Sequence, residues 1–517
     1  MTKLEIYDCT LREGEQAAGV SFSLAERIEI AKALNDLGVD YIELGWPIHP
    51  EVLDAFLEVK KLQLHSKIVA FGSTSIASKV EEDKNLESII KSQAEYACIF
   101  GKSWLEHVEK QLRISAEENL KKISDSIRFL KNAGINVFYD AEHYFDAFKA
   151  DKEYALKTLE EAQKAGASRI ILCDTNGGTM LDEVKEIIKE TRKYFDERQI
   201  NIGLGVHFHN DSGLALANSL VSLEYVKQIQ ATVNGLGERV GNTDLCELAP
   251  LLMLKKGIKL RIKLDKLQEL SELVNDVANL PAQITQAFSQ RAFTHKGGVH
   301  IDATKKGASY EHVNPEMLGL NHELILSSLG GAACVISAAE KFGYKLDKND
   351  EKTRKKISAL LEELSETEKK GYDLGNVEAE QFMLIEKHFG NLKEFFSVDK
   401  WRVVTEGNGS KCFLRLRING EQYTIKKSVE GGPVDAAYKA MFQLVAERYP
   451  ALKKIKLADY KVRIGKSKGP ASSVRTRIDF SDGEEFSAVG VSENIIESSI
   501  EAISKGFNYY LNRELRI

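Results

Sequence analysis

The chain has 517 residues, of which 43% are hydrophobic and 29% charged, and its formal net charge is −6. These proportions are typical of an ordinary globular protein and exclude wholesale disorder, a collagen-like chain and a multi-span membrane protein. Because acidic residues slightly outnumber basic ones, no general positive field exists to gather nucleic acid or anionic lipid. We therefore expect neither a nucleic-acid partner nor a membrane partner.

Cysteine usage and the first residues bear on the cellular compartment. The six cysteines form no C-x-x-C pair and are sparse for this length, as expected of reduced, buried thiols. The segment MTKLEIYDCTLREGEQ has no basic stretch followed by an apolar one, so it does not resemble a signal peptide. No run approaches the ~18 apolar residues that a membrane-spanning helix needs. A cytoplasmic location is expected.

Short apolar runs alternate with segments of helical period through the first 255 residues. The segment 23–37 is typical of these helices, since Ser23 is a good N-cap and Gly38 a good stop. Eight strand candidates in this alternation predict an α/β fold, a (β/α)8 TIM barrel, over a doubly wound open sheet. The runs are Leu4–Cys9, Tyr41–Leu44, Ile68–Phe71, Tyr96–Phe100, Ile135–Asp140, Arg169–Cys173, Gly203–Phe208 and Gln230–Val233.

The rest of the chain changes character twice. Residues 256–395 carry few strand signals and several charged segments of helical period, which predicts a helical connector. Residues 396–517 contain six alternating runs and two helical segments, in the order of two β-β-β-α units. We therefore predict a barrel domain over 1–265, a helical linker or subdomain over 266–395 and a C-terminal α+β domain over 396–517.

Polar, titratable side chains recur where the predicted strands end. In a barrel of this kind the carboxyl ends of the strands meet at one rim, where the following loops build the functional site. The first, fifth, sixth, seventh and eighth strands run into TLREGEQ, YDAEH, CDTNGG, HFHND and VNGLGERVGN. Stability does not require such clustering. The candidate residues at these ends are Arg12, Glu13, Asp140, Glu142, Thr175, His207, His209 and Asn234.

The HFH triplet is the strongest single signal. Side chains two apart on a strand point to the same face, so His207 and His209 can offer two imidazoles to one ion. Glu13, across the barrel mouth, can add a carboxylate. Two histidines and a carboxylate with positions left open suit Zn, Mn, Fe or another divalent ion. Two core histidines satisfied by hydrogen bonds are the alternative, which a strand-end position disfavours.

Arg12 and Glu142 each allow two interpretations. Arg12 is either half of a surface ion pair with its neighbour or a fixed cation that stabilises an oxyanion. Glu142 is either a solvated rim carboxylate or, facing inward beside Asp140, a group for proton transfer. The residues alone leave both choices open.

Four separated motifs resemble one enzyme family. In order, YDCTLREGEQ, HFHNDSGLALANSL, VNGLGERVGNTDL and THKGGVHIDA are similar to motifs of the α-isopropylmalate, homocitrate and citramalate synthases. These are metal-dependent Claisen-condensing enzymes on a barrel that hydroxymethylglutaryl-CoA lyases share. GGPVDAAYKA and AVGVSENIIESSIEA resemble the family's allosteric domain, which implies a regulatory role for residues 396–517. YIELGWP, FGKSW and YDAEH look most like the citramalate synthase branch.

The resemblance implies a metal site. Glu13, His207 and His209 would bind a divalent metal (Mn, Mg, Zn or Co), with Asn234 at or near the ion. Many members carry Asp where this chain has Glu13, and homocitrate synthases carry Glu, so ligation is retained while metal preference is open.

The resemblance also implies catalytic roles and an oligomer. Arg12 matches the arginine that stabilises the enolate or alkoxide, and Glu142 and Thr175 match acid/base and keto-acid-binding positions. His300 and Tyr310 match residues that the connector inserts into a partner subunit's active site, which implies at least a homodimer. His143 and His295 are expected to be structural.

The implied reaction condenses acetyl-CoA, the co-substrate, with a keto acid. One extra methylene in an apolar pocket discriminates by only ~1–3 kcal/mol, so small wall changes switch substrate. We expect the wall near Trp46, Phe71, Phe100 and Asp140. Asp140 would repel the second carboxylate of 2-oxoglutarate, and an inward Phe100 suits a small substrate. Both favour pyruvate and therefore citramalate as product, and the resemblance implies isoleucine as effector.

Three alternatives remain beside this hypothesis. A synthase using 2-oxoisovalerate would serve leucine biosynthesis instead. A lyase of this fold would lack a module like residues 396–517. A barrel that has lost catalysis and only senses amino acids is disfavoured by the intact Arg12, Glu13, His207 and His209.

Overall fold

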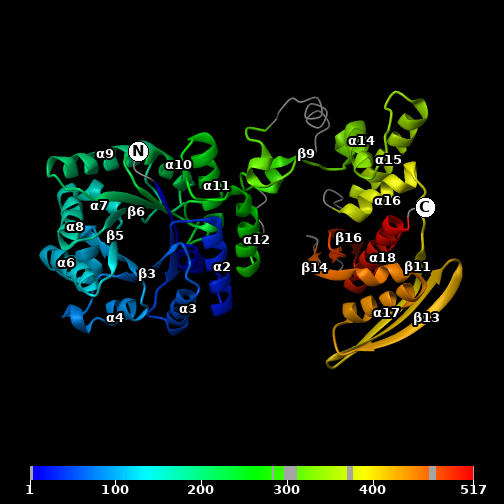
Figure 1. Ribbon diagram of the computed structural model, residues 1–517, viewed down its shortest axis with the longest axis horizontal. Coiled ribbons are helices and arrows are strands. Elements are labelled where there is room, and N and C mark those ends of the chain that lie inside the picture. The colour runs from blue at the N-terminus through cyan, green and yellow to red at the C-terminus, as the bar shows by residue number, and fades with distance from the viewer. Residues whose placement is uncertain (1–3, 282–284, 296–310, 370–376, 465–472, 516–517) are drawn as a thin grey trace. The chain divides into compact units, whose positions relative to one another are not determined.

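The computed structural model describes residues 4–281, 285–295, 311–369, 377–464 and 473–515. The chain separates into two units, residues 1–293 with 313–321 and residues 294–312 with 322–517. In Figure 1 the first unit runs from blue to green, and its helices surround the strands. Each unit is described by itself. Within the described residues, no helix combines the length and apolar character needed to cross a membrane.

The first unit is a closed barrel of eight parallel strands in sequential order, which confirms the predicted fold. Parallel pairing of β1 with β8 closes the ring. The strands are β1 (Glu5–Asp8), β2 (Tyr41–Gly45), β3 (Lys67–Ser73), β4 (Tyr96–Lys102), β5 (Asn136–Glu142), β6 (Arg169–Asp174), β7 (Gly203–Phe208) and β8 (Gln228–Ala231).

Helices follow the strands and cover the outside of the barrel. The first long one begins at a capping box, because Ser23 accepts from the Glu26 N–H and Glu26 accepts from the Ser23 N–H. It ends at Gly38, whose φ of 101° a β-carbon would disfavour. The helices of this unit are α1 (Thr10–Glu13), α2 (Leu24–Leu37), α3 (Pro50–Lys61), α4 (Lys84–Lys91), α5 (Leu105–His107), α6 (Ala116–Asn132), α7 (Tyr144–Ala150), α8 (Lys152–Ala165), α9 (Leu181–Glu197), α10 (Ala215–Val221), α11 (Leu245–Pro250) and α12 (Leu267–Val277).

The barrel interior changes from aromatic to polar along the strands. Tyr7, Tyr41 and Phe138 fill it near the amino ends, with ring centroids of Tyr41 and Phe138 5.2 Å apart. Two residues further along β2 and β5, the period-2 alternation places Glu43 and Asp140 on the same inner face, both buried. The aromatic layer therefore lies beneath buried polar side chains that are nearer the carboxyl ends of the strands.

Among its described residues, the second unit contains a helical layer, one two-stranded sheet and two three-stranded sheets. Short strands β9 (Thr294–His295) and β10 (Glu323–Leu324) pair, and α14 (Gly331–Lys341), α15 (Glu351–Lys369) and α16 (Glu378–Phe389) pack around Val335, Leu360 and Ile385. The terminal part follows the predicted two β-β-β-α units. They are β11 (Phe396–Glu406), β12 (Gly409–Ile418), β13 (Glu421–Val429) and α17 (Pro433–Arg448), then β14 (Lys456–Ile464), β15 (Val474–Ser481), β16 (Glu485–Ser492) and α18 (Ile495–Glu514). The domain boundaries at 265 and 395 stay predictions.

Candidate active site and metal centre

Glu13, His207 and His209 meet at the carboxyl end of the barrel. One ligand atom from each lies within 4.8 Å of the others, and all three side chains are buried. His207 lies on β7 and His209 follows it, whereas Glu13 ends α1, the single turn after β1. The Nε2 atoms of the two histidines are 3.3 Å apart, and His209 Nε2 is 3.6 Å from Glu13 Oε1. The HxH spacing and the strand-end position thus bring together the three residues that the sequence singled out.

Gln230 on β8 orients His207. Its Oε1 lies 2.8 Å from His207 Nδ1, and its Nε2 donates to Asp140 Oδ1 at 3.3 Å. Since the amide oxygen can only accept, Nδ1 carries the proton and the lone pair is on Nε2, facing His209. Cys98 Sγ also donates to Asp140 Oδ1, at 3.0 Å. Partners of this kind fix the tautomer of metal-binding histidines.

The electrostatics of the cluster fit a divalent cation. Burial, with the charge of His209 second, lowers the pKa of His207 well below its usual 6.5. Burial is the main cause and the positive charge of Arg239 the second, and they lower the pKa of His209 to about 3. Both imidazoles are therefore neutral near pH 7, the form that binds metals. Glu13 Oε1 is buried and accepts no hydrogen bond from any described residue. An ion bound by Glu13, His207 and His209 would give this buried oxygen the partner that it otherwise lacks among the described residues.

Arg12 is fixed beside the cluster by two carboxylates. Its Nε donates to Glu43 Oε1 at 2.6 Å and its Nη1 pairs with Glu13. Its guanidinium also lies over the Phe71 ring, 3.9 Å from the centroid. Burial is the largest single effect and lowers the pKa of Arg12, but the negative groups around the guanidinium, with Glu43 first, together raise it. Arg12 is thus a permanent cation in a defined orientation, and not a surface ion pair.

Glu142, Lys102 and Thr175 lie at the rim formed by β4, β5 and β6. Lys102 Nζ is 2.5 Å from Glu142 Oε2. Thr175 Oγ1 accepts from the backbone N–H of His143 at 2.8 Å, and His143 has a positive φ of 57°. Sequence reasoning missed Lys102 and Glu43. Each is a charged residue within an otherwise apolar strand, in FGKSW and YIELG, and that contrast could have identified both.

An aromatic wall borders the site on the side of β2, β3 and β4. The Phe100 ring stacks on Phe71 with centroids 5.5 Å apart, and Trp46 contacts Phe100 edge-on at 6.0 Å. Asp140 is buried beside this wall, and burial raises its pKa to about 7. These are the four side chains expected at the pocket wall.

The Asn234 side chain is hydrogen-bonded to its neighbours, and its expected place at or near the ion stays a prediction. Its Oδ1 accepts from Ser271 Oγ at 2.6 Å and Gln286 Nε2 at 3.0 Å, and its Nδ2 donates to the Ser271 carbonyl at 2.9 Å. These bonds direct the amide to α12, which supplies Ser271. His300 and Tyr310 lie outside the described residues.

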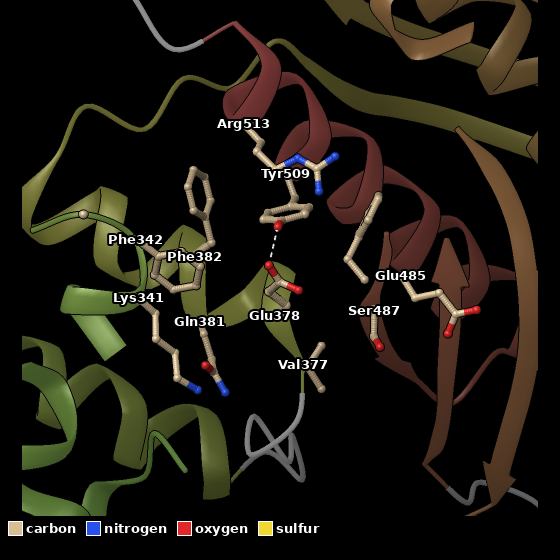
Figure 2. A pocket seen from close by; sticks show the side chains of 12 residues that line it. Lys341, Phe342, Val377, Glu378, Gln381, Phe382, Glu485, Ser487, Tyr509 and Arg513 are labelled. Atoms are coloured by element: carbon tan, nitrogen blue, oxygen red, sulfur yellow. Dashed lines mark hydrogen bonds between the residues drawn. The ribbon is translucent and has the colours of Figure 1, made fainter. Parts of the chain in front are cut away.

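The second unit contains a cavity of about 660 Å³, shown in Figure 2. Phe342, Phe382 and Tyr509 supply aromatic lining, and Tyr509 donates to Glu378 Oε1 at 2.6 Å. Arg513 stands at the upper edge. Because its walls come from α16 as well as from α18 and β16, the cavity links the connector helices to the terminal module.

Comparison with protein-family models agrees with this architecture. Residues 3–274 match an HMGL-like model, residues 288–369 a homocitrate synthase post-HMGL domain-like model, and residues 376–511 a LeuA allosteric (dimerisation) domain model. The first model alone covers more than half of the chain. The chain belongs to the HMGL-like family, in the branch of acyltransferases that contains the citramalate and isopropylmalate synthases.

Full-length similarity supports this assignment. The chain is 41% identical to the (R)-citramalate synthase of Geobacter sulfurreducens, covering 100% of this chain and 99% of that one. It is 40% identical to the (R)-citramalate synthase of Aquifex aeolicus, covering 99% and 98%. Identity to a 2-isopropylmalate synthase of Methanocaldococcus jannaschii is 32%, covering 98% and 95%.

Proposed function

We propose that this enzyme condenses acetyl-CoA with pyruvate and water to give (R)-citramalate and coenzyme A. The observation that carries the proposal is the buried set of Glu13, His207 and His209 beside a fixed Arg12, at the open end of the barrel. Full-length similarity to two (R)-citramalate synthases supports the choice of reaction.

The residues divide the chemistry among them. A divalent ion at Glu13, His207 and His209 would polarise the keto-acid carbonyl and orient it for attack. Glu142 takes a proton from the methyl group of acetyl-CoA, and the C–H electron pair forms the new bond to the carbonyl carbon. The former carbonyl oxygen gains the negative charge, which Arg12 stabilises, and it then takes a proton to become the hydroxyl group of the product, while Glu142 gives up the proton that it received. Water then cleaves the thioester, releasing coenzyme A and a carboxylate.

The wall of Trp46, Phe71 and Phe100 supports a small keto acid. The three rings contact one another, and a bulky aromatic wall of this kind beside Asp140 favours a small keto acid over a branched one. 2-Oxoisovalerate is the second candidate, because a 2-isopropylmalate synthase is also similar over the full chain.

The test is coenzyme A release from acetyl-CoA with Mn²⁺ or Mg²⁺, using pyruvate, 2-oxobutyrate, 2-oxoisovalerate and 2-oxoglutarate. We expect kcat/KM to be highest for pyruvate. A preference for 2-oxoisovalerate would keep the mechanism and refute the pocket interpretation. No release with any keto acid would refute the proposed function and favour a sensing role.

We further propose that isoleucine inhibits this activity through residues 396–517. The match to an allosteric domain model supports a second site, and feedback requires a coupling free energy between the two sites. The measurement is citramalate formation over a range of isoleucine concentrations, with leucine as control. Equal rates with and without isoleucine would contradict this part of the proposal alone.

A further inference from the structure

Lys102 is a buried cation at the rim of the barrel. Its residue exposure is 8%, although lysine is almost never buried without a charged partner. The partner is Glu142, whose Oε2 lies 2.5 Å from the lysine Nζ. The ammonium therefore lies against the carboxylate that the proposed mechanism uses as a base.

Strand register sets this pair. Lys102 and Glu142 are the last residues of β4 and β5, and their Cα atoms are register partners. The neighbouring backbone is anchored too, because Asn119 Nδ2 donates to the Lys102 carbonyl at 2.8 Å and the Ser103 N–H donates to the Glu142 carbonyl at 3.4 Å. Phe100 and Asp140 lie two residues before Lys102 and Glu142, so they are on the same inner faces of β4 and β5. The ion pair is thus the outermost inward-facing layer of these two strands.

Stability gives a weak reason for such a pair. Removing two charges from water costs about as much as their attraction returns, and apolar replacements are often neutral or stabilising. Backbone pairing already holds β4 and β5 in register, so an ion pair that only joined these strands would add little. The pair lies at the rim, where Lys102 Nζ is 5.9 Å from the centroid of the Phe100 ring in the aromatic wall. This position indicates a role in the reaction.

We propose that Lys102 is a positioning residue for Glu142, an inference that rests on the proposed condensation. The ammonium attracts Oε2 as an ion pair and thereby restricts the rotamer of the carboxylate. Oε1 remains to receive the proton that leaves the methyl carbon of acetyl-CoA. Without Lys102 the carboxylate can rotate and pair elsewhere at the rim, and the proton transfer loses its geometry.

The experiment compares Lys102→Met, Lys102→Gln and Lys102→Arg in the full-length enzyme. For the Met and Gln variants we expect kcat to fall about 100-fold, within the range that a positioned base supplies, with little change in KM for the keto acid. With trideuterated acetyl-CoA, the isotope effect on kcat/KM should rise, because C–H cleavage becomes slower relative to other steps. Lys102→Arg should recover part of kcat, since it keeps the charge.

The matched control is Arg169→Met. Arg169 pairs with Glu5 and has side-chain exposures close to those of the rim pair, 15% and 23% against 10% and 21%. Both control residues begin their strands, β6 and β1, at the opposite end of the barrel. We expect unchanged kcat and an unchanged isotope effect, whatever the change in Tm.

The outcomes separate the two proposals. Wild-type enzyme inactive with all four keto acids would refute the proposed function and this inference with it. If the wild-type enzyme is active and Lys102→Gln has the same kcat and the same isotope effect as wild type, the positioning role alone would be refuted. A rise in KM at constant kcat would show that Lys102 binds substrate and would also overturn it. If Lys102→Met does not fold, Lys102→Gln and Lys102→Arg decide.

Discussion

Replacing Gln230 by Met should weaken metal binding without touching a metal ligand. Gln230 Oε1 accepts from His207 Nδ1, 2.8 Å away, and its Nε2 reaches Asp140 at 3.3 Å. Methionine has a similar volume but offers His207 no acceptor, so the imidazole loses its fixed tautomer and orientation. Losing an outer partner of this kind lowers metal affinity about 10- to 100-fold. That is about 1.4–2.7 kcal/mol.

The assay is calorimetric titration of metal-stripped full-length enzyme with Mn²⁺, so the readout is affinity and not turnover. Gln228→Met is the matched control, because Gln228 is buried on the same strand and neither of its amide atoms is bonded to a described residue. We expect it to bind Mn²⁺ like wild type and to unfold at an equal or higher temperature. Wild-type affinity in Gln230→Met, or an equal loss in both variants, would refute the reasoning.

Two further predictions concern pH and subunit sharing. Burial raises the pKa of Asp8 from 3.8 to about 7, so the folded state binds more protons than the unfolded state between those values, and stability falls as pH rises through that window. Asp8→Asn should therefore gain stability over wild type as pH rises from about 4 to about 7, by at most about 4 kcal/mol in the free energy of unfolding, and its Tm should rise relative to wild type; parallel Tm profiles in calorimetry would contradict this. If His300 completes a partner's site, mixing His300→Ala with Glu13→Ala protomers should restore about a quarter of wild-type activity after random exchange into dimers. No recovery, once exchange is verified by mass spectrometry, would count against sharing.

The fold was accessible from the sequence because its periodicity is strong. Parallel strands buried on both faces give continuous apolar runs, and the eight runs map onto the eight barrel strands. In the terminal module one face of each sheet is covered, so the alternation of apolar and polar residues is strong, and the six alternating runs correspond to the six strands β11 to β16. Helices α3 and α4 were not singled out, although they occupy the places that a (β/α)8 order requires.

The site was accessible only in part, because sequence position identifies a strand end but not the direction of every side chain. His207 and His209 obey the two-residue period of a strand, so their convergence could be deduced. Asn234 sits in a turn with a positive φ of 59°, where no period applies, and its amide is bound to Ser271 and Gln286. Lys102 and Glu43 stand out in the sequence as charged residues in apolar strands, but that their side chains are buried at the site depends on barrel closure.

Barrel closure also brings together the residues of the candidate metal site. Glu13 and His207 are separated by most of the first unit in sequence, and only the pairing of β1 with β8 and of β8 with β7 brings them together. Gln230 lies on β8, the strand that pairs with both β1 and β7. It is therefore part of the barrel closure, and its side chain also orients His207. A chain with β1 unpaired would keep the HFH face but lose the carboxylate, so ion binding by this set reports a closed barrel. Metal affinity and the stability of the β1–β8 pairing are therefore thermodynamically linked.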